Sequence, residues 1–119
     1  MKALISALAA ASMTAAVAAW SAPTPAYDHV VRIDEKTYNP DLLDVAVGDK
    51  VIWKNFDSDN HSVTAEYRPA LPQDKLDFDS GVILSGGSFE HDFVKEGTYK
   101  YYCRFHPEVS GTVTVHSTR

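Results

Sequence analysis

The residues best suited to chemistry lie in two short segments, NHSVTA (60–65) and YYCRFHP (101–107). Cys103 precedes His106 by three residues, which is close enough for both side chains to reach one ion. A C-x2-H pair alone is a weak signal, because a Cys and a His at this spacing occur by chance in many chains. His61 adds a third donor. One soft thiolate and two imidazoles suit copper in an electron-transfer site, whereas structural zinc usually requires four protein ligands.

Cys103 is the single cysteine of the chain. Exported proteins usually employ cysteines in pairs, as disulfides, because their compartment is oxidising. An unpaired cysteine can form a disulfide bridge in a dimer, remain an inert buried thiol or bind a metal. The nearby histidines favour the metal ligand.

The first residues of the chain indicate export. Met1 and Lys2 open with a positive charge, and residues 3–19 contain no charge and are mostly Ala, Leu, Val and Ile. This pattern predicts a signal peptide over 1–22, followed by one folded domain over 27–119.

Small residues within 19–26 offer several cleavage points, and export predicts a periplasmic location. The alternative is an N-terminal membrane anchor. It is weaker because Trp20 and Pro23 end an alanine-rich run that is short for a bilayer. We therefore expect no stable membrane insertion.

The charge balance excludes one class of partner. Without Lys2, ten of the 11 Lys and Arg residues remain against 16 Asp and Glu, a net charge near −6. Nucleic acid would be repelled, and no basic cluster opposes this conclusion. An acidic surface suits a basic protein partner, although acidity is also a common route to solubility.

The segments that must position the chemical residues are short and strand-like. In the segment from Thr98 to Tyr102, alternation places Tyr99, Tyr101 and Cys103 on one face, so the sulfur points into the end of a sandwich. The Gly48-Asp49 turn predicts a hairpin between its two flanking strands. We expect an all-β fold, a Greek-key β-sandwich of about seven to eight strands. The candidate strands are 29–33, 43–47, 51–53, 61–65, 88–93, 98–102 and 112–116.

Five motifs together resemble one known family, the cupredoxins, which are small blue type 1 copper proteins. The resemblance covers nearly all of the chain after the leader, with its elements in the family's order. It implies a cupredoxin-like sandwich, one copper ion that alternates between Cu(I) and Cu(II), and electron transfer to redox protein partners by a monomer. The motifs are YNPDLLDVAVGDKVIWKN (38–55), NHSVT (60–64), FDSG (78–81), GGSFEHDFVKEGTYKYYC (86–103) and CRFHP (103–107).

The resemblance also assigns roles to single residues. His61, Cys103 and His106 become the equatorial copper ligands. Ser62 takes the place where the family often has an Asn that braces the ligand loop, and Asn60 joins it in the second shell. In such proteins the second histidine usually offers its outer edge to partners. That edge is framed here by two further residues, Phe105 and Pro107.

Val109 departs from the family's pattern. Short-loop members read C-x2-H-x2-M, in which the Met sulfur is a weak axial ligand, and valine at this position cannot coordinate. Both methionines of the chain, Met1 and Met13, lie in the predicted leader. Since the axial ligand helps to set the reduction potential, an apolar neighbour should disfavour Cu(II) relative to Cu(I).

Other candidate residues have ordinary interpretations. We expect His29, His91 and His116 to be sheet residues without a metal, and Glu108 to point to solvent rather than to the axial position. Asp57 and Asp59 form a solvated turn or attract a basic partner. The aromatic residues pack the core or, alternatively, form an electron path; they are Trp53, Phe89, Tyr99, Tyr101 and Tyr102.

These residues are compatible with three functions to different degrees. An electron carrier needs only a rigid three-ligand site. A periplasmic copper chaperone or buffer is the alternative, since it would tolerate a Cu(I)-preferring site, but the Met- or His-rich tracts common in such proteins are lacking after the leader. An enzyme would need an open, wet copper position and acid-base residues, and Val109 favours a dry site. We expect a carrier and no enzyme.

Overall fold

The computed structural model describes residues 25–72 and 75–119, and the predicted signal peptide lies outside them. The described residues form eight β-strands, which confirms the all-β prediction. Within this part of the chain, no helix is long and apolar enough to span a membrane. The strands are β1 (Asp28–Asp34), β2 (Thr37–Asn39), β3 (Leu42–Ala46), β4 (Lys50–Asn55), β5 (Thr64–Ala65), β6 (Ser88–Asp92), β7 (Gly97–Cys103) and β8 (His106–His116).

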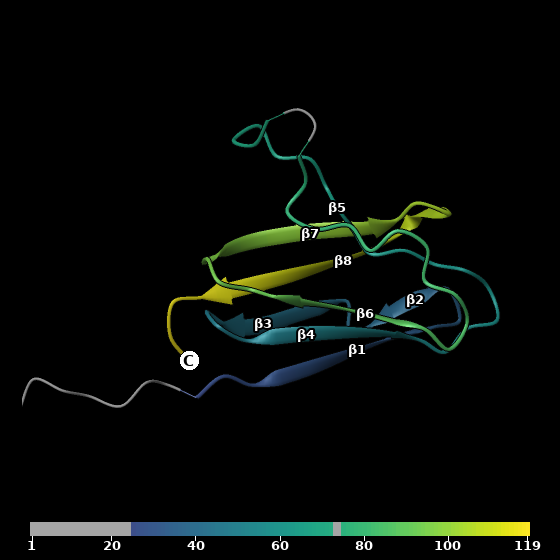
Figure 1. Cartoon of the computed structure of the whole chain (residues 1–119), viewed down its shortest axis with the longest axis horizontal. Helices are drawn as coiled ribbons and strands as arrows, with labels where there is room; N and C mark the ends of the chain where they lie inside the picture. The colour runs from purple at the N-terminus through teal and green to yellow at the C-terminus, as the bar shows by residue number, and fades with distance from the viewer. Residues whose placement is uncertain (1–24, 73–74) are drawn as a thin grey trace, which may run out of the picture.

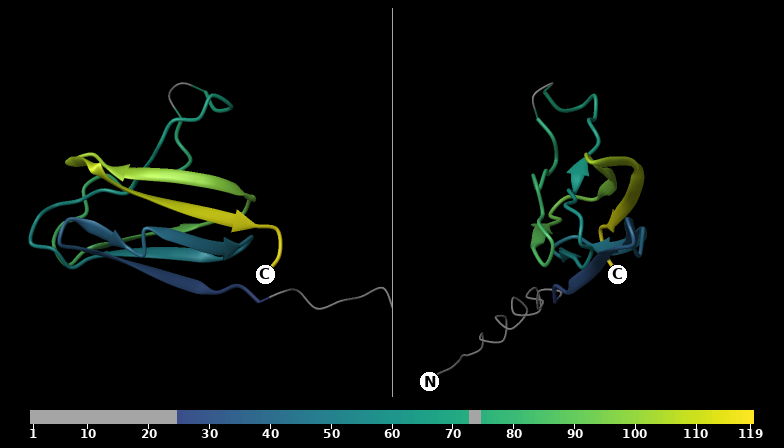
Figure 2. Two further views of the ribbon diagram at one scale, coloured as in Figure 1. Left: turned by 180° about the vertical axis from the view of Figure 1, so that it is seen from behind. Right: turned by 90° about the vertical axis from the view of Figure 1, so that its right-hand side faces the viewer.

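The strands form two layers that face each other across the core (Figures 1 and 2). One sheet has the order β2-β1-β4-β6 and the other the order β3-β8-β7-β5. β1 pairs with β4, and β3 with β8, in parallel, while the other pairs are antiparallel. The predicted sandwich is therefore confirmed. The described segment just after β5 extends away from both sheets (Figure 1), whereas Phe78 and Ile83, later in the same connection, are buried in the core.

The predicted hairpin at Gly48-Asp49 is wrong, because β3 and β4 belong to different sheets. Gly48 has a φ of 97°, and its N–H bonds the carbonyl of Phe93. Asp49, fully buried, accepts a hydrogen bond from the N–H of Ala46. These contacts turn the chain from one layer to the other, so that each strand finds a parallel partner instead of its sequence neighbour.

Three strand predictions differ from the structure. The short strand β2 was not predicted. The predicted strand at 61–65 is reduced to β5 and an isolated bridge between His61 and Ile83. β8 begins at His106 rather than at residue 112, because its pairing with β7 continues to the tip of the hairpin.

The core is built around the indole of Trp53, which is fully buried. Ring centroids of Tyr101 and Phe78 lie 5.4 and 5.9 Å from it. Tyr99, Tyr101 and Cys103 are all buried, as the alternation in β7 predicted. Gly111 on β8 faces the Tyr101 ring so closely that an added Cβ would overlap it, which explains the glycine. Trp53, Tyr99 and Tyr101 therefore pack the core, with Phe89 against them, and this packing holds the ends of β7 and β8 in place. Tyr102 is half-buried on the opposite face of β7.

Candidate metal centre

His61 is held by a turn that follows β4. Asn55, the last residue of β4, is buried, and its amide donates hydrogen bonds to the carbonyls of Asp59 at 2.9 Å and Ile83 at 3.0 Å. Its side-chain oxygen accepts the N–H of Asp57 at 2.9 Å. His61 and Ile83 then pair through both backbone groups. Since buried polar groups are costly unless bonded, this network specifies the turn and fixes the backbone of His61.

Cys103 and His106 lie at the tip of the β7–β8 hairpin, where only Arg104 and Phe105 separate the two strands. The two ligand candidates are partners in the ladder. The hairpin tip and the segment that carries His61 lie at the same end of the sandwich (Figure 1). A strand that ends on Cys103 therefore places its thiol at the same end of the sandwich as His61.

The three predicted ligands come together at this end. Cys103 Sγ lies 3.6 Å from His61 Nδ1, and both residues are fully buried. The ring of His106 lies 5.1 Å from that of His61, centroid to centroid, and is half-buried. Within residues 25–72 and 75–119, no three His, Cys, Asp or Glu side chains already encircle one position for a metal ion. The donor chemistry fits copper, with His106 as the side chain that must complete the set.

Asp57 was predicted to lie in a solvated turn or to attract a partner, and its contact with His61 was not predicted. Its carboxylate lies 2.8 Å from His61 Nε2 and also accepts the N–H of Lys36. The hydrogen bond from His61, followed by that from Lys36, keeps the pKa of Asp57 below its usual range. The carboxylate fixes the Nε2–H tautomer, so that the Nδ1 lone pair faces the sulfur. A carboxylate four residues before a predicted ligand in a compact turn was the available signal.

Ser62 and Asn60, both predicted to support the ligands from behind, differ in burial. Ser62 is buried, and its Oγ accepts the N–H of Arg104 at 2.9 Å. The phenol of Tyr38 donates to the carbonyl of Ser62. Ser62 therefore links the His61 segment to the Cys103–His106 turn. Asn60 is exposed, and its second-shell role stays a prediction.

Val109 is 9 % exposed and packs into the core, whereas its neighbour Glu108 is exposed. Strand alternation accounts for this difference, since adjacent residues of β8 face opposite sides. A surface hollow of about 410 Å³ borders both residues, with Tyr38 and Asp41 on its other wall. Val109 therefore lies between the apolar core and a hollow that is open to solvent.

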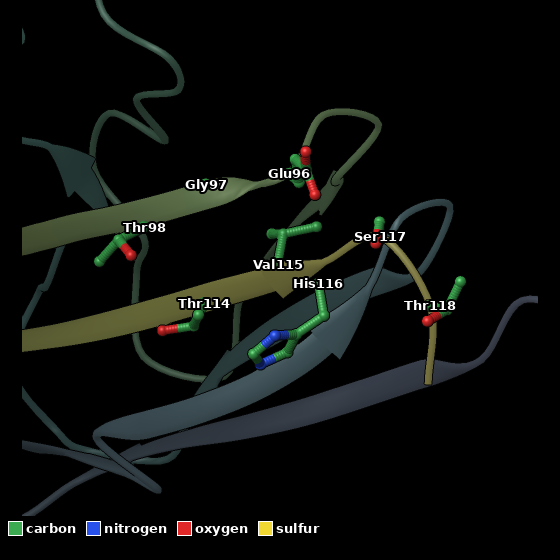
Figure 3. A pocket seen from close by; sticks show the side chains of 8 residues that line it. All are labelled: Glu96, Gly97, Thr98, Thr114, Val115, His116, Ser117 and Thr118. Atoms are coloured by element: carbon green, nitrogen blue, oxygen red, sulfur yellow. The ribbon is translucent and has the colours of Figure 1, made fainter.

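The remaining histidines lie away from these ligands. His29 Nε2 contacts Asp49 at 2.8 Å, and His116 Nε2 contacts Asp44 at 3.0 Å. The ring of His91 lies 5.0 Å from that of Phe78, and burial lowers the pKa of this histidine. A hollow of about 470 Å³ beside His116, at the opposite end of β8, therefore lies apart from the candidate centre (Figure 3).

Apolar side chains surround the outer edge of the site. Phe105 is 47 % exposed, and Pro107 is exposed beside His106. Val82 and Leu84, at 55 % and 63 % exposed, flank Ile83, the bridge partner of His61. Scattered exposed apolar residues need no explanation, but four at one end of a small protein form a candidate contact surface.

A two-layer β-sandwich that brings one thiol and two imidazoles together at one end defines a class of small single-metal proteins. The sequence matches the cupredoxin-like domain family over residues 3–115. It is 30 % identical over 117 residues to amicyanin-alpha of Methylorubrum extorquens, with 95 % of this chain and 96 % of that protein covered. The chain belongs to the cupredoxin family.

Two solved structures extend the comparison. A novel purple cupredoxin from Nitrosopumilus maritimus is 35 % identical, with a TM-score of 0.64 over 74 % of this chain and 99 % of that one. A methionine-to-alanine variant of amicyanin in the Cu(I) form is 29 % identical, with a TM-score of 0.66 over 75 % and 82 %. The expected family and fold are thus confirmed, and the cofactor of these proteins is one copper ion that cycles between Cu(I) and Cu(II).

Proposed function

We propose that this chain is a periplasmic electron carrier that holds its copper through His61, Cys103 and His106. The observation that carries the proposal is the buried contact of 3.6 Å between Cys103 Sγ and His61 Nδ1. Those two atoms are the donors that a copper site of this type requires. When bound there, copper supplies a single-electron redox couple.

The residues around the proposed copper site make it rigid and keep water out. Asp57 holds the tautomer of His61, and Ser62 ties the two ligand segments together. Val109 belongs to the same buried cluster as Cys103 and ends in methyl groups, so it offers no donor. A site whose ligands are fixed by packing and hydrogen bonds rearranges little between oxidation states, which favours fast electron transfer over catalysis. This supports a non-enzymatic role.

The partner of the carrier would dock on the apolar edge around His106. Phe105, Pro107, Val82 and Leu84 are exposed there, and the chain as a whole is acidic. We expect a basic redox protein whose association weakens as salt rises. Phe105→Lys should slow exchange with such a partner while copper stays bound, because it removes an apolar contact and repels a basic surface. Equal rates would mean that the docking surface lies elsewhere.

The visible absorption spectrum of the Cu(II)-loaded protein tests the ligand set. The wild type should show an intense band in the red region from a cysteine thiolate on copper, and Cys103→Ser should lose it. Cys103→Ser retains the size of the side chain, so its folding should be preserved. A wild type without the band would favour a copper buffer or a zinc site. A variant that keeps the colour would overturn the assignment of Cys103.

A further inference from the structure

The turn that carries Cys103 and His106 is not fixed by the β7–β8 ladder alone. The pairing of the two strands is regular from Gly97 to Tyr102 and shifts register between Tyr102 and Cys103. Such an irregularity removes ladder hydrogen bonds at the place where two ligand candidates lie. Another set of contacts must therefore hold the turn.

Those contacts come from Arg104 and from the segment 79–81. The Arg104 guanidinium donates to Asp79 Oδ2 at 2.7 Å. Asp79 also pairs with Thr64 through an isolated backbone bridge, and its Oδ1 accepts the Thr64 hydroxyl at 3.0 Å. The backbone of Arg104 in turn bonds Ser62 Oγ, which lies 3.0 Å from Thr64 Oγ1. The four residues therefore form a closed ring, which we call the Arg104–Asp79 clamp.

Elementary hydrogen-bond chemistry fixes the direction of every bond in the clamp. The Asp79 carboxylate can only accept hydrogen bonds, so Thr64 donates its single hydroxyl proton to Asp79. Ser62 must then donate to Thr64, and its oxygen accepts the N–H of Arg104. Each bond polarises the next, which strengthens the set. Burial opposes ionisation of Asp79, but the bonds from Gly81, Arg104 and Thr64 still keep its pKa below the usual range.

The clamp joins the two ligand-bearing segments. Ser62 and Thr64 lie one and three residues after His61, and Arg104 follows Cys103 directly. Thr64 is fully buried, and Ser62 is 1 % exposed, so their hydroxyls have no water to replace a lost partner. We propose that Arg104 and Asp79 are positioning residues that hold the Cys103–His106 turn against the His61 segment and so set the geometry of the metal centre. This inference rests on the proposed function for its last step only.

A matched pair of variants tests the clamp. Asp79→Asn places an amide N–H₂ or a neutral oxygen against the Arg104 guanidinium and removes the ion pair. The control is Asp77→Asn, which breaks the equally short contact of 2.7 Å between Arg68 Nε and Asp77, away from both ligand segments. The two changes remove the same charge from neighbouring positions, so a difference between them reports on the clamp.

The first measurement uses the metal-free protein and does not depend on copper. Hydrogen exchange at the backbone N–H of Arg104 should accelerate about fivefold in Asp79→Asn, which corresponds to one hydrogen bond of ordinary net strength. The N–H of Tyr99 in the regular part of β7 should not change, and Asp77→Asn should leave both rates as in the wild type. Arg104→Lys, which keeps the charge, should lie between wild type and Arg104→Gln. Unchanged exchange at Arg104 in Asp79→Asn would overturn the proposal.

The second measurement uses the Cu(II)-loaded protein. In Asp79→Asn the relative intensities of the visible thiolate bands and the rhombicity of the electron paramagnetic resonance signal should change, while Asp77→Asn keeps the wild-type signature. Faster exchange with an unchanged copper signature would contradict the role in the metal centre. If the wild type itself shows no thiolate band, the proposed function fails, and the exchange rates still decide whether the clamp holds the turn.

Discussion

The two ends of the sandwich contain the same contact with opposite burial. At one end, His61 Nε2 lies 2.8 Å from Asp57, with the histidine 0 % and the aspartate 17 % exposed. At the other end, His29 Nε2 lies 2.8 Å from Asp49, with the histidine 23 % and the aspartate 0 % exposed. A His–Asp distance alone therefore does not identify a functional site.

The difference lies in what else the buried partner contacts. Asp49 accepts hydrogen bonds from Arg119, Ala46, Tyr27 and His29, so both of its oxygens are fully engaged. His61 bonds Asp57 through Nε2 only, and its Nδ1 faces the Cys103 thiol. The end with Asp49 is therefore a structural anchor. The end with His61 leaves one nitrogen atom, Nδ1, free of the aspartate and available as a metal donor. The predictions below test this contrast from the largest effect to the smallest.

Loss of either histidine should separate the two ends most clearly. His61→Gly removes a proposed ligand and should weaken Cu(II) binding by more than about a hundredfold, beyond the effect of losing a supporting residue. His29→Gly should leave copper affinity within about twofold, because the structural end has no donor to lose. Competitive titration with a chelator measures both. Similar losses in the two variants would erase the functional contrast.

Neutralising the aspartates should give the opposite ranking for stability. Asp49→Asn leaves Arg119 facing an uncharged group and should lower the free energy of unfolding by about 3 kcal/mol. Asp57→Asn keeps an acceptor for His61 and should cost about 1 kcal/mol. Urea denaturation of the metal-free proteins gives both values. A greater loss of stability in Asp57→Asn would show that the metal end is also the anchor of the fold.

Val109→Met should sharpen the description of the metal end. A thioether donates weakly to Cu(II) and matters little to Cu(I), so a dry three-ligand site should have a lower reduction potential after the change. If an oxygen from water or Glu108 reaches the wild-type copper through the adjacent hollow, the soft sulfur should raise it instead. Protein-film voltammetry resolves the sign, since about 59 mV is tenfold in a one-electron equilibrium. An unchanged potential would mean that Val109 is not over the metal.

Arg119→Ala should weaken the structural end by a smaller amount. The hydrogen bonds from Arg119 are the main reason why the pKa of Asp49 lies far below its usual range, against burial and together with bonds from Ala46, Tyr27 and His29. A depressed carboxyl pKa stabilises the fold above the unfolded value near pH 4 and loses that contribution as pH falls toward the folded value.

The variant raises the folded pKa of Asp49, so it should be less stable than the wild type at pH 7 and show a shallower loss of stability below about pH 4. Thermal melts between pH 2 and pH 7 would give both quantities. Arg68→Ala, which removes a more exposed Arg–Asp pair, is the control. An equal pH dependence of stability in Arg119→Ala and wild type would mean that Arg119 does not stabilise the ionised Asp49.

The parts predicted from sequence were those governed by local pattern. Alternation in β7 assigned Tyr99, Tyr101 and Cys103 to one face, and the C-x2-H spacing placed two ligand candidates on one turn. Alternation gives the face of a residue but not the neighbour of its strand, so the hairpin at Gly48-Asp49 was wrong. The roles of Asp57, Asp79 and Arg104 depend on contacts between segments that meet only in three dimensions.

The parallel pairs described above also determine the order in which the chain assembles. Cys103 and His106 share a hairpin, which can form within microseconds, but Leu42 must find Thr112 before β3 and β8 can pair. Such distant pairings make folding slow. His61, 42 residues from Cys103 in sequence, joins the other two donors only when the sandwich closes. Copper that prefers the complete set of proposed donors would therefore stabilise the folded protein selectively, because the chain offers it only two of the three donors before the sandwich closes.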